Sequence, residues 1–183
     1  DILWLTKITE YPNEGSEKKT DLKLIFTAPF QQKRYLVSVL IVFLWNFFAN
    51  TTGSFYTVYL LEQVKVGYSF INLVGAIYVP CVLFLGPVWA RYINRTSWFG
   101  AFYKALLAYG IFYLGQSFVT ADWPWLYVVV ILFCNLMAPA INIIMANMSF
   151  YHIPEKNQSI YLTFCTTLSM IGALLGNYYA TTF

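Results

Sequence analysis

Six amide and hydroxyl side chains lie inside long apolar stretches and are the candidates to contact a solute: Asn46, Asn50, Tyr56, Asn135, Asn142 and Thr166. Asn46 and Asn50 are four residues apart, and Asn135 and Asn142 are seven apart, so each pair shares one face of a helix. Polar groups are costly in hydrocarbon and usually face a bundle interior or a water-filled cavity. The six residues therefore predict a substrate pathway. The alternatives are interhelical hydrogen bonding, at about 0.6 kcal/mol per bond, and, for Tyr56, ordinary packing.

Side chains suited to catalysis or metal binding are absent from the centres of these stretches. No Asp, Glu, Lys, Arg or His lies there, which argues against a proton relay or a fixed charge that binds an ion. The sequence has no His-Glu-x-x-His motif, and Cys81, Cys134 and Cys165 are too far apart for a metal or disulfide motif. The net charge of +3 is small and dispersed, unlike a nucleic-acid footprint. We expect no catalytic residue, metal, cofactor or nucleic-acid partner.

The elements that carry the six residues are predicted from composition. Only 10% of the 183 residues are charged, where soluble domains have about 25%, and 59% are hydrophobic. A soluble all-α protein would need a polar face on each helix, and these stretches show almost none. A membrane-spanning helix takes about 20 apolar residues. The sequence therefore predicts an all-α, polytopic transmembrane helix bundle with about five spans, at residues 35–61, 70–89, 98–119, 124–150 and 160–183.

Positive charge predicts the orientation of these spans, because cytoplasmic loops retain Lys and Arg. When alternate loops are taken together, ten basic residues fall on one side and one, Lys65, on the other. The predicted cytoplasmic side carries residues 1–34, the loop with Arg91 and Arg95, and the loop with His152. We therefore divide the chain into a cytoplasmic linker, residues 1–34, and a transmembrane bundle, residues 35–183.

Both ends of the chain have the composition of interrupted spans. Residues 2–5 are apolar and are followed by Lys7, like the end of a preceding span, and Phe183 lies inside an apolar stretch. We expect the sequence to belong to a longer membrane protein with further spans upstream.

Three motifs lie at residues 44–60, 86–95 and 153–164, and together they resemble segments of bacterial transporters of the major facilitator superfamily. Residues 44–50, with Phe55, Tyr56, Tyr59 and Leu60, resemble helix seven of that family. Residues 86–95 resemble its loop signature of Gly, then Asp-Arg, then a closing Arg, and residues 153–159 with Tyr161, Leu162 and Phe164 are similar to the entry into helix eleven. The segments follow one another in the same order as in that family. The resemblance therefore covers the family's central loop and helices seven to eleven of its twelve helices.

The resemblance implies part of a secondary active transporter that moves a small solute by alternating access. Helices seven, eight, ten and eleven would line the pathway, with nine outside. Gly86, Arg91 and Arg95 would form the gating loop. Ala90 stands where the family has Asp, so the alternative role of the two arginines is to anchor the cytoplasmic side.

The partners implied are a small-molecule substrate, the lipid bilayer and an N-terminal half of the same protein. The expected location is the cell membrane, plasma or inner, with multiple passes. A non-transporting receptor or scaffold on the same fold is the alternative, and a membrane enzyme is a more distant one. Substrate identity, direction, coupling ion and oligomeric state are left open by the sequence.

Overall fold

The structure is a computed structural model that describes residues 25, 27–154 and 158–182. These residues form a short 3₁₀ helix, Pro29–Gln31, and six α-helices, with no strand. The α-helices are α3 (Lys33–Glu62), α4 (Tyr68–Ala76), α5 (Tyr78–Arg95), α6 (Trp98–Gln116), α7 (Leu126–Met148) and α8 (Gln158–Thr182). Most of the linker predicted at residues 1–34 and part of the loop at 153–159 lie outside the described residues.

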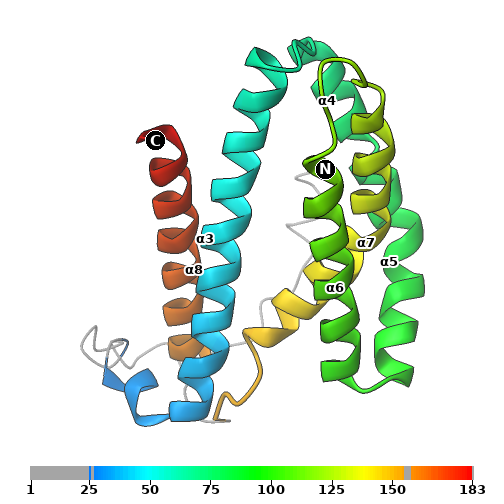
Figure 1. Cartoon of the computed structure of the whole chain (residues 1–183). Coiled ribbons are helices and arrows are strands. Elements are labelled where there is room, and N and C mark those ends of the chain that lie inside the picture. The colour runs from blue at the N-terminus through cyan, green and yellow to red at the C-terminus, as the bar shows by residue number, and fades with distance from the viewer. Residues whose placement is uncertain (1–24, 26, 155–157, 183) are drawn as a thin grey trace, which may run out of the picture.

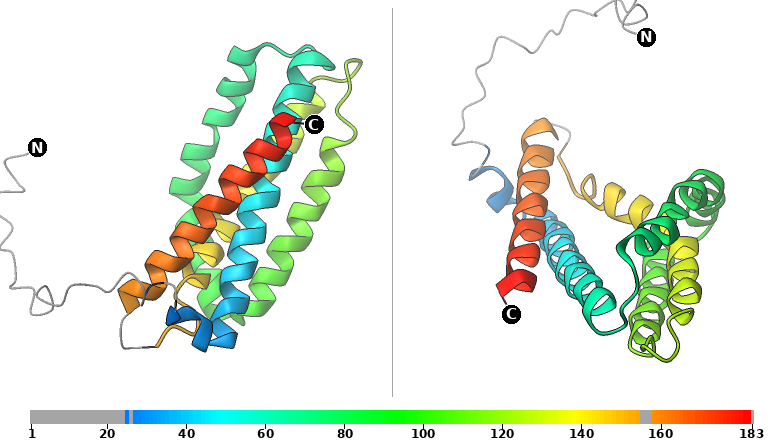
Figure 2. Two further views of the ribbon diagram at one scale, coloured as in Figure 1. Left: turned by 90° about the vertical axis from the view of Figure 1, so that its left-hand side faces the viewer. Right: turned by 90° about the horizontal axis from the view of Figure 1, so that it is seen from above.

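α4 and α5 run in the same direction, and α3, the α4–α5 stretch, α6, α7 and α8 alternate in direction between the two ends of the bundle (Figure 1). α3 and α8 lie side by side as one pair, while α4, α5 and α6 gather around the first half of α7 (Figures 1 and 2). The second half of α7 runs across toward the start of α3. The loops after α3 and α6 therefore share one end of the bundle, and the α5–α6 and α7–α8 connections share the other.

Four stretches of helix are long and apolar enough to cross a membrane: Lys33–Glu62, Tyr68–Arg95, Leu126–Met148 and Gln158–Thr182. The chain is therefore an all-helical membrane protein, as the sequence predicted. The third predicted span, residues 98–119, corresponds to α6, which has 19 residues and is not among the four. Its tyrosines, glycines and Lys104 make it less hydropathic than its neighbours.

Prolines explain two irregularities in the helices. α4 ends at Ala76 and α5 begins at Tyr78, so the second predicted span is broken at Ile77. Pro80 has no N–H to donate to the carbonyl of Ala76, which ends the regular hydrogen bonding there. Pro139 lies inside α7 and likewise leaves the carbonyl of Asn135 without its usual helical donor. α7 turns toward α3 in this region (Figure 1).

Two buried clusters hold the bundle together, one near each end. The cluster at the end where α3 begins draws on α3, α5, α6, α7 and α8, and includes Tyr35 and Ile144, both fully buried. The hydroxyl of Tyr35 donates to the carbonyl of Tyr161, and Tyr161 Oη donates to Ala28 O at 3.2 Å. The opposite cluster joins Leu60 of α3 to α4, α6, α7 and the loop residue Val119. Apart from these clusters, most large apolar side chains face outward, as expected in lipid.

The α3–α8 pair is packed through glycines. A Cβ at Gly172 would lie 2.8 Å from Phe43 O, and one at Gly176 would overlap the carbonyl oxygen of Phe47. Thr51 Oγ1, which lies within hydrogen-bonding reach of Phe47 O, also lies 3.2 Å from Gly176 O. Small residues allow this close backbone approach in membranes, so the two helices form a tight seam.

Candidate functional site

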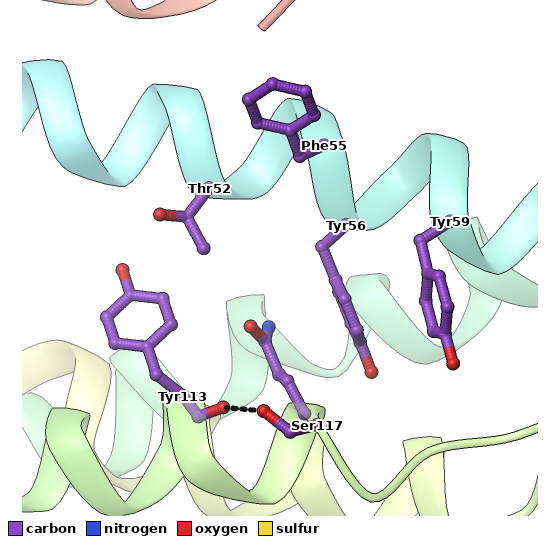
Figure 3. A pocket seen from close by; sticks show the side chains of 7 residues that line it. Thr52, Phe55, Tyr56, Tyr59, Tyr113 and Ser117 are labelled. Atoms are coloured by element: carbon purple, nitrogen blue, oxygen red, sulfur yellow. Dashed lines mark hydrogen bonds between the residues drawn. The ribbon is translucent and has the colours of Figure 1, made fainter. Parts of the chain in front are cut away.

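A cavity of about 560 Å³ lies between α3 and α6. The residues that line it are Thr52, Phe55, Tyr56, Tyr59, Tyr113, Gln116 and Ser117. Tyr56 and Tyr59 extend from α3 toward the α6 side, and the Tyr113 hydroxyl points toward Thr52 (Figure 3). A second cavity of about 380 Å³ shares Thr52, Tyr56, Tyr113 and Gln116 and reaches α7 at Ile131 and Asn142. We call the two together the α3–α6 cavity.

Helical spacing explains why these side chains meet. Thr52, Tyr56 and Tyr59 are separated by four and three residues, and so they lie along one face of α3. Tyr113 and Gln116 are three apart on α6, which puts them on one face of that helix. The α3–α6 cavity is therefore bounded by two matching rows of aromatic and hydrogen-bonding groups.

The two tyrosines that α3 contributes to the cavity differ in their hydrogen bonding. Tyr59 Oη donates to Val119 O at 2.8 Å, which ties α3 to the loop that follows α6. Tyr56 Oη is buried and has no hydrogen-bond partner among the described residues. The rings stack with centroids 6.1 Å apart. An unpaired buried hydroxyl costs free energy that a bound acceptor would recover, so Tyr56 is the lining residue with an unmet hydrogen bond.

Asn135 in α7 is the second polar side chain with an unmet hydrogen bond. It is 5% exposed, and its Nδ2 has no partner in the part of the chain that the structure describes. It does not line the α3–α6 cavity. Asn135 lies one turn before Pro139, which removes a backbone hydrogen bond from α7. This part of α7 therefore lacks both a backbone and a side-chain hydrogen bond among the described residues.

The other predicted pathway residues are distributed over the bundle. Asn142 Nδ2 donates to Tyr78 Oη at 2.6 Å and lines the second cavity beside Tyr56. Asn46 Nδ2 donates to Val42 O at 2.9 Å and Asn50 Nδ2 to Asn46 O at 2.7 Å, both within α3. Thr166 is exposed on α8 and bonds to its own helix. The structure therefore brings Tyr56 and Asn142 together and leaves the other four apart.

The predicted gating residues lie on the second half of α5. Gly86 has open space where a Cβ would be, and Arg91 is exposed, with Nε donating to Pro87 O at 3.2 Å. Arg95 is exposed in the last turn of the same helix. All three lie within the span Tyr68–Arg95 or at its end. None of them lines the α3–α6 cavity.

Sequence reasoning missed the contribution of α6 to the cavity. We expected this helix to lie outside the pathway, yet Tyr113, Gln116 and Ser117 form one wall. The signal available was the row of Tyr109, Tyr113 and Gln116, spaced four and three residues apart. Aromatic rows in membrane helices usually indicate packing, so spacing alone does not distinguish a cavity wall from a packed face.

The chemistry of the α3–α6 cavity is uncharged. The described residues that line it offer hydroxyls, amides and aromatic rings, and none carries a charge. No group of three His, Cys, Asp or Glu residues that would hold a metal ion occurs in the described ranges. Comparison of the chain with protein-family models, with curated proteins and with solved structures finds no match. The function therefore has to be argued from the cavity itself.

Proposed function

We propose that the chain is part of a secondary active transporter of the cell membrane, and that the α3–α6 cavity binds its solute. The single observation that carries this proposal is a cavity between membrane helices whose wall includes Tyr56, a residue with a buried hydroxyl that has no partner among the described residues. Ligand sites typically combine apolar and aromatic walls with a few hydrogen-bonding groups. The resemblance to the major facilitator superfamily supports transport by alternating access, with α6 as a fifth span.

The walls favour an uncharged solute that has both an apolar face and hydroxyl groups. Tyrosine rings supply a surface for stacking, and Thr52, Gln116 and Tyr56 supply donors and acceptors. A charged solute would lose its hydration without gaining a counter-charge, which is costly in a low-dielectric site. Phenyl β-glucoside fits this description, and phenyl glucuronide differs from it mainly by a carboxylate.

The test is flux of these two solutes into proteoliposomes that contain the transporter of which this chain is proposed to be a part. We expect phenyl glucoside to enter faster than into protein-free liposomes, and phenyl glucuronide to show no such difference. Tyr56→Phe should lower the apparent affinity by roughly threefold to tenfold, the equivalent of one hydrogen bond. Tyr68→Phe, a change at an exposed tyrosine of α4, is the matched control and should leave flux unchanged.

The outcomes separate the proposal from its alternative. Binding of the glucoside without flux would favour a receptor or scaffold. Absence of both would contradict the solute site, and equal flux of glucoside and glucuronide would contradict the uncharged class.

A further inference from the structure

A second groove opens on the opposite half of the bundle, where α5, α6 and α7 meet. It has a volume of about 330 Å³ and is lined by Val88, Trp89, Tyr92, Lys104, Ala105 and Met137. Trp89 Nε1 donates to Leu136 O at 2.9 Å, so its polar atom is satisfied by α7 and its ring faces the groove as an apolar surface. Ala105 is almost fully buried and gives the groove its depth. The groove is therefore apolar except at Lys104.

Lys104 is held at the rim of this groove. Its Nζ donates to Tyr92 Oη at 2.7 Å and lies 5.4 Å from the centre of the Tyr92 ring. An ammonium group has three donors, and Tyr92 is its only hydrogen-bond partner within the described ranges. Two donors thus stay available for an outside acceptor.

Among the described residues, no acidic side chain lies at the end of the bundle that carries Lys104. Arg91 and Arg95 are exposed on α5 and, with Tyr92, lie within two turns of the same helix. The two acidic residues among the described ones, Glu62 and Asp122, lie at the end of α3 and in the loop after α6. That end is the opposite end of the bundle (Figure 1). Within the described residues Lys104, Arg91 and Arg95 therefore have no carboxylate partner, and an external anion would neutralise this end of α5 and α6.

The position of Lys104 along α6, and hence its depth in the membrane, indicates which kind of anion would bind. It lies six residues after Trp98, the first residue of α6, which corresponds to about 9 Å along the helix. A lysine at this depth reaches the headgroup level by extending its side chain, while Val88 and Met137 stay at the level of acyl chains. Basic pockets between membrane helices on the cytoplasmic side suit lipid phosphates. A free phosphate ion would leave the apolar part of the groove empty.

We propose that this groove binds one anionic phospholipid, with an acyl chain against Val88, Trp89 and Met137 and its phosphate at Lys104, supported by Arg91 and Arg95. This site is independent of the solute cavity. It gives the two arginines a role in lipid recognition that does not need the family carboxylate missing at Ala90.

The experiment is a titration of the detergent-purified full chain, followed by thermal unfolding and by native mass spectrometry. The probes are phosphatidylglycerol, phosphatidylcholine with the same acyl chains, and inorganic phosphate. We expect phosphatidylglycerol to raise the unfolding midpoint and to be retained as one bound molecule, and the other two probes to do neither. Lys104→Gln should weaken apparent binding about fivefold, the usual contribution of one basic residue near an anionic surface.

Controls keep the test decisive. Lys33→Gln removes a basic residue at the same end of the bundle, at the start of α3 and outside the groove, and should bind as wild type. Lys104→Arg should retain binding. If Lys104→Gln does not fold, the exposed pair Arg91→Gln and Arg95→Gln supplies the measurement and should also weaken binding. Equal stabilisation by phosphatidylcholine would overturn the proposal, and so would full binding by Lys104→Gln or by the Arg91→Gln and Arg95→Gln pair. Stabilisation by phosphate alone would exclude a lipid.

Discussion

α3 meets α8 across a seam of glycines on one side and faces α6 across a cavity lined by tyrosines on the other. Along the seam, Gly172 and Gly176 bring backbone against backbone, and Ser54 Oγ donates to Asn177 Oδ1 at 2.9 Å. Along the cavity, Thr52 and Tyr56 stand opposite Tyr113 with space between them (Figure 3). The difference shows how one helix can be fixed on one face and available to a ligand on the other.

Residue size explains this contrast. Without a hydrophobic driving force between helices in lipid, association depends on close packing and interhelical hydrogen bonds. Glycines remove side chains from the seam and allow contact along its length. Tyrosines lie on both walls of the cavity, and the contacts across it are made by side chains: Tyr59 Oη donates to Val119 O, and the Trp45 ring packs edge-on against Tyr109 at 5.1 Å between centroids.

The largest effect should follow from filling the seam. Gly176→Leu places a side chain where even a Cβ would overlap the Phe47 carbonyl, and we expect a loss of about 3 kcal/mol in the free energy of unfolding. Gly110→Leu on α6, where a Cβ meets nothing within 4 Å, should change it by less than about 0.5 kcal/mol. Unfolding of the purified chain in mixed micelles, followed by circular dichroism, measures both. Equal effects would show that the seam is not tighter than the rest.

A smaller effect should separate the two tyrosines of the cavity. Tyr59→Phe breaks the bond to Val119 O and should cost about 1 kcal/mol of stability. Tyr56→Phe removes a hydroxyl that has no partner among the described residues, so stability should stay the same or rise slightly. The same unfolding measurement applies. If Tyr56→Phe destabilises as much as Tyr59→Phe, the Tyr56 hydroxyl already has a partner in the folded protein and the case for a solute there is lost.

The helices were predictable from the sequence, whereas the cavity was not. Long apolar runs must be helical in lipid, since every backbone group needs an internal partner, and the prediction of an all-helical membrane protein is confirmed by the four apolar helices. The break at Ile77 was missed because residues 70–89 were predicted as one continuous span. Asn46 and Asn50 share a face as predicted, but whether an amide bonds to its own helix or to a solute depends on the neighbouring helix.

Contacts between helices also explain why the sequence did not reveal that α6 lines the cavity. Tyr113 and Gln116 become cavity residues only because α3 stands opposite them. Tyr56 differs from Tyr59 only because the carbonyl of Val119 lies within reach of one hydroxyl and not of the other. Such differences arise from tertiary placement and leave no trace in residue type or spacing.

Photolabelling tests the central claim, that the solute binds between α3 and α6, most directly. The full chain in proteoliposomes would be irradiated with 4-azidophenyl β-glucoside and the modified peptides identified by mass spectrometry. We expect label on residues 52–59 of α3 and 113–117 of α6, reduced by excess phenyl glucoside, and none on residues 172–177 of α8. Label on α8 or on lipid-facing surfaces that excess glucoside does not reduce would contradict the account.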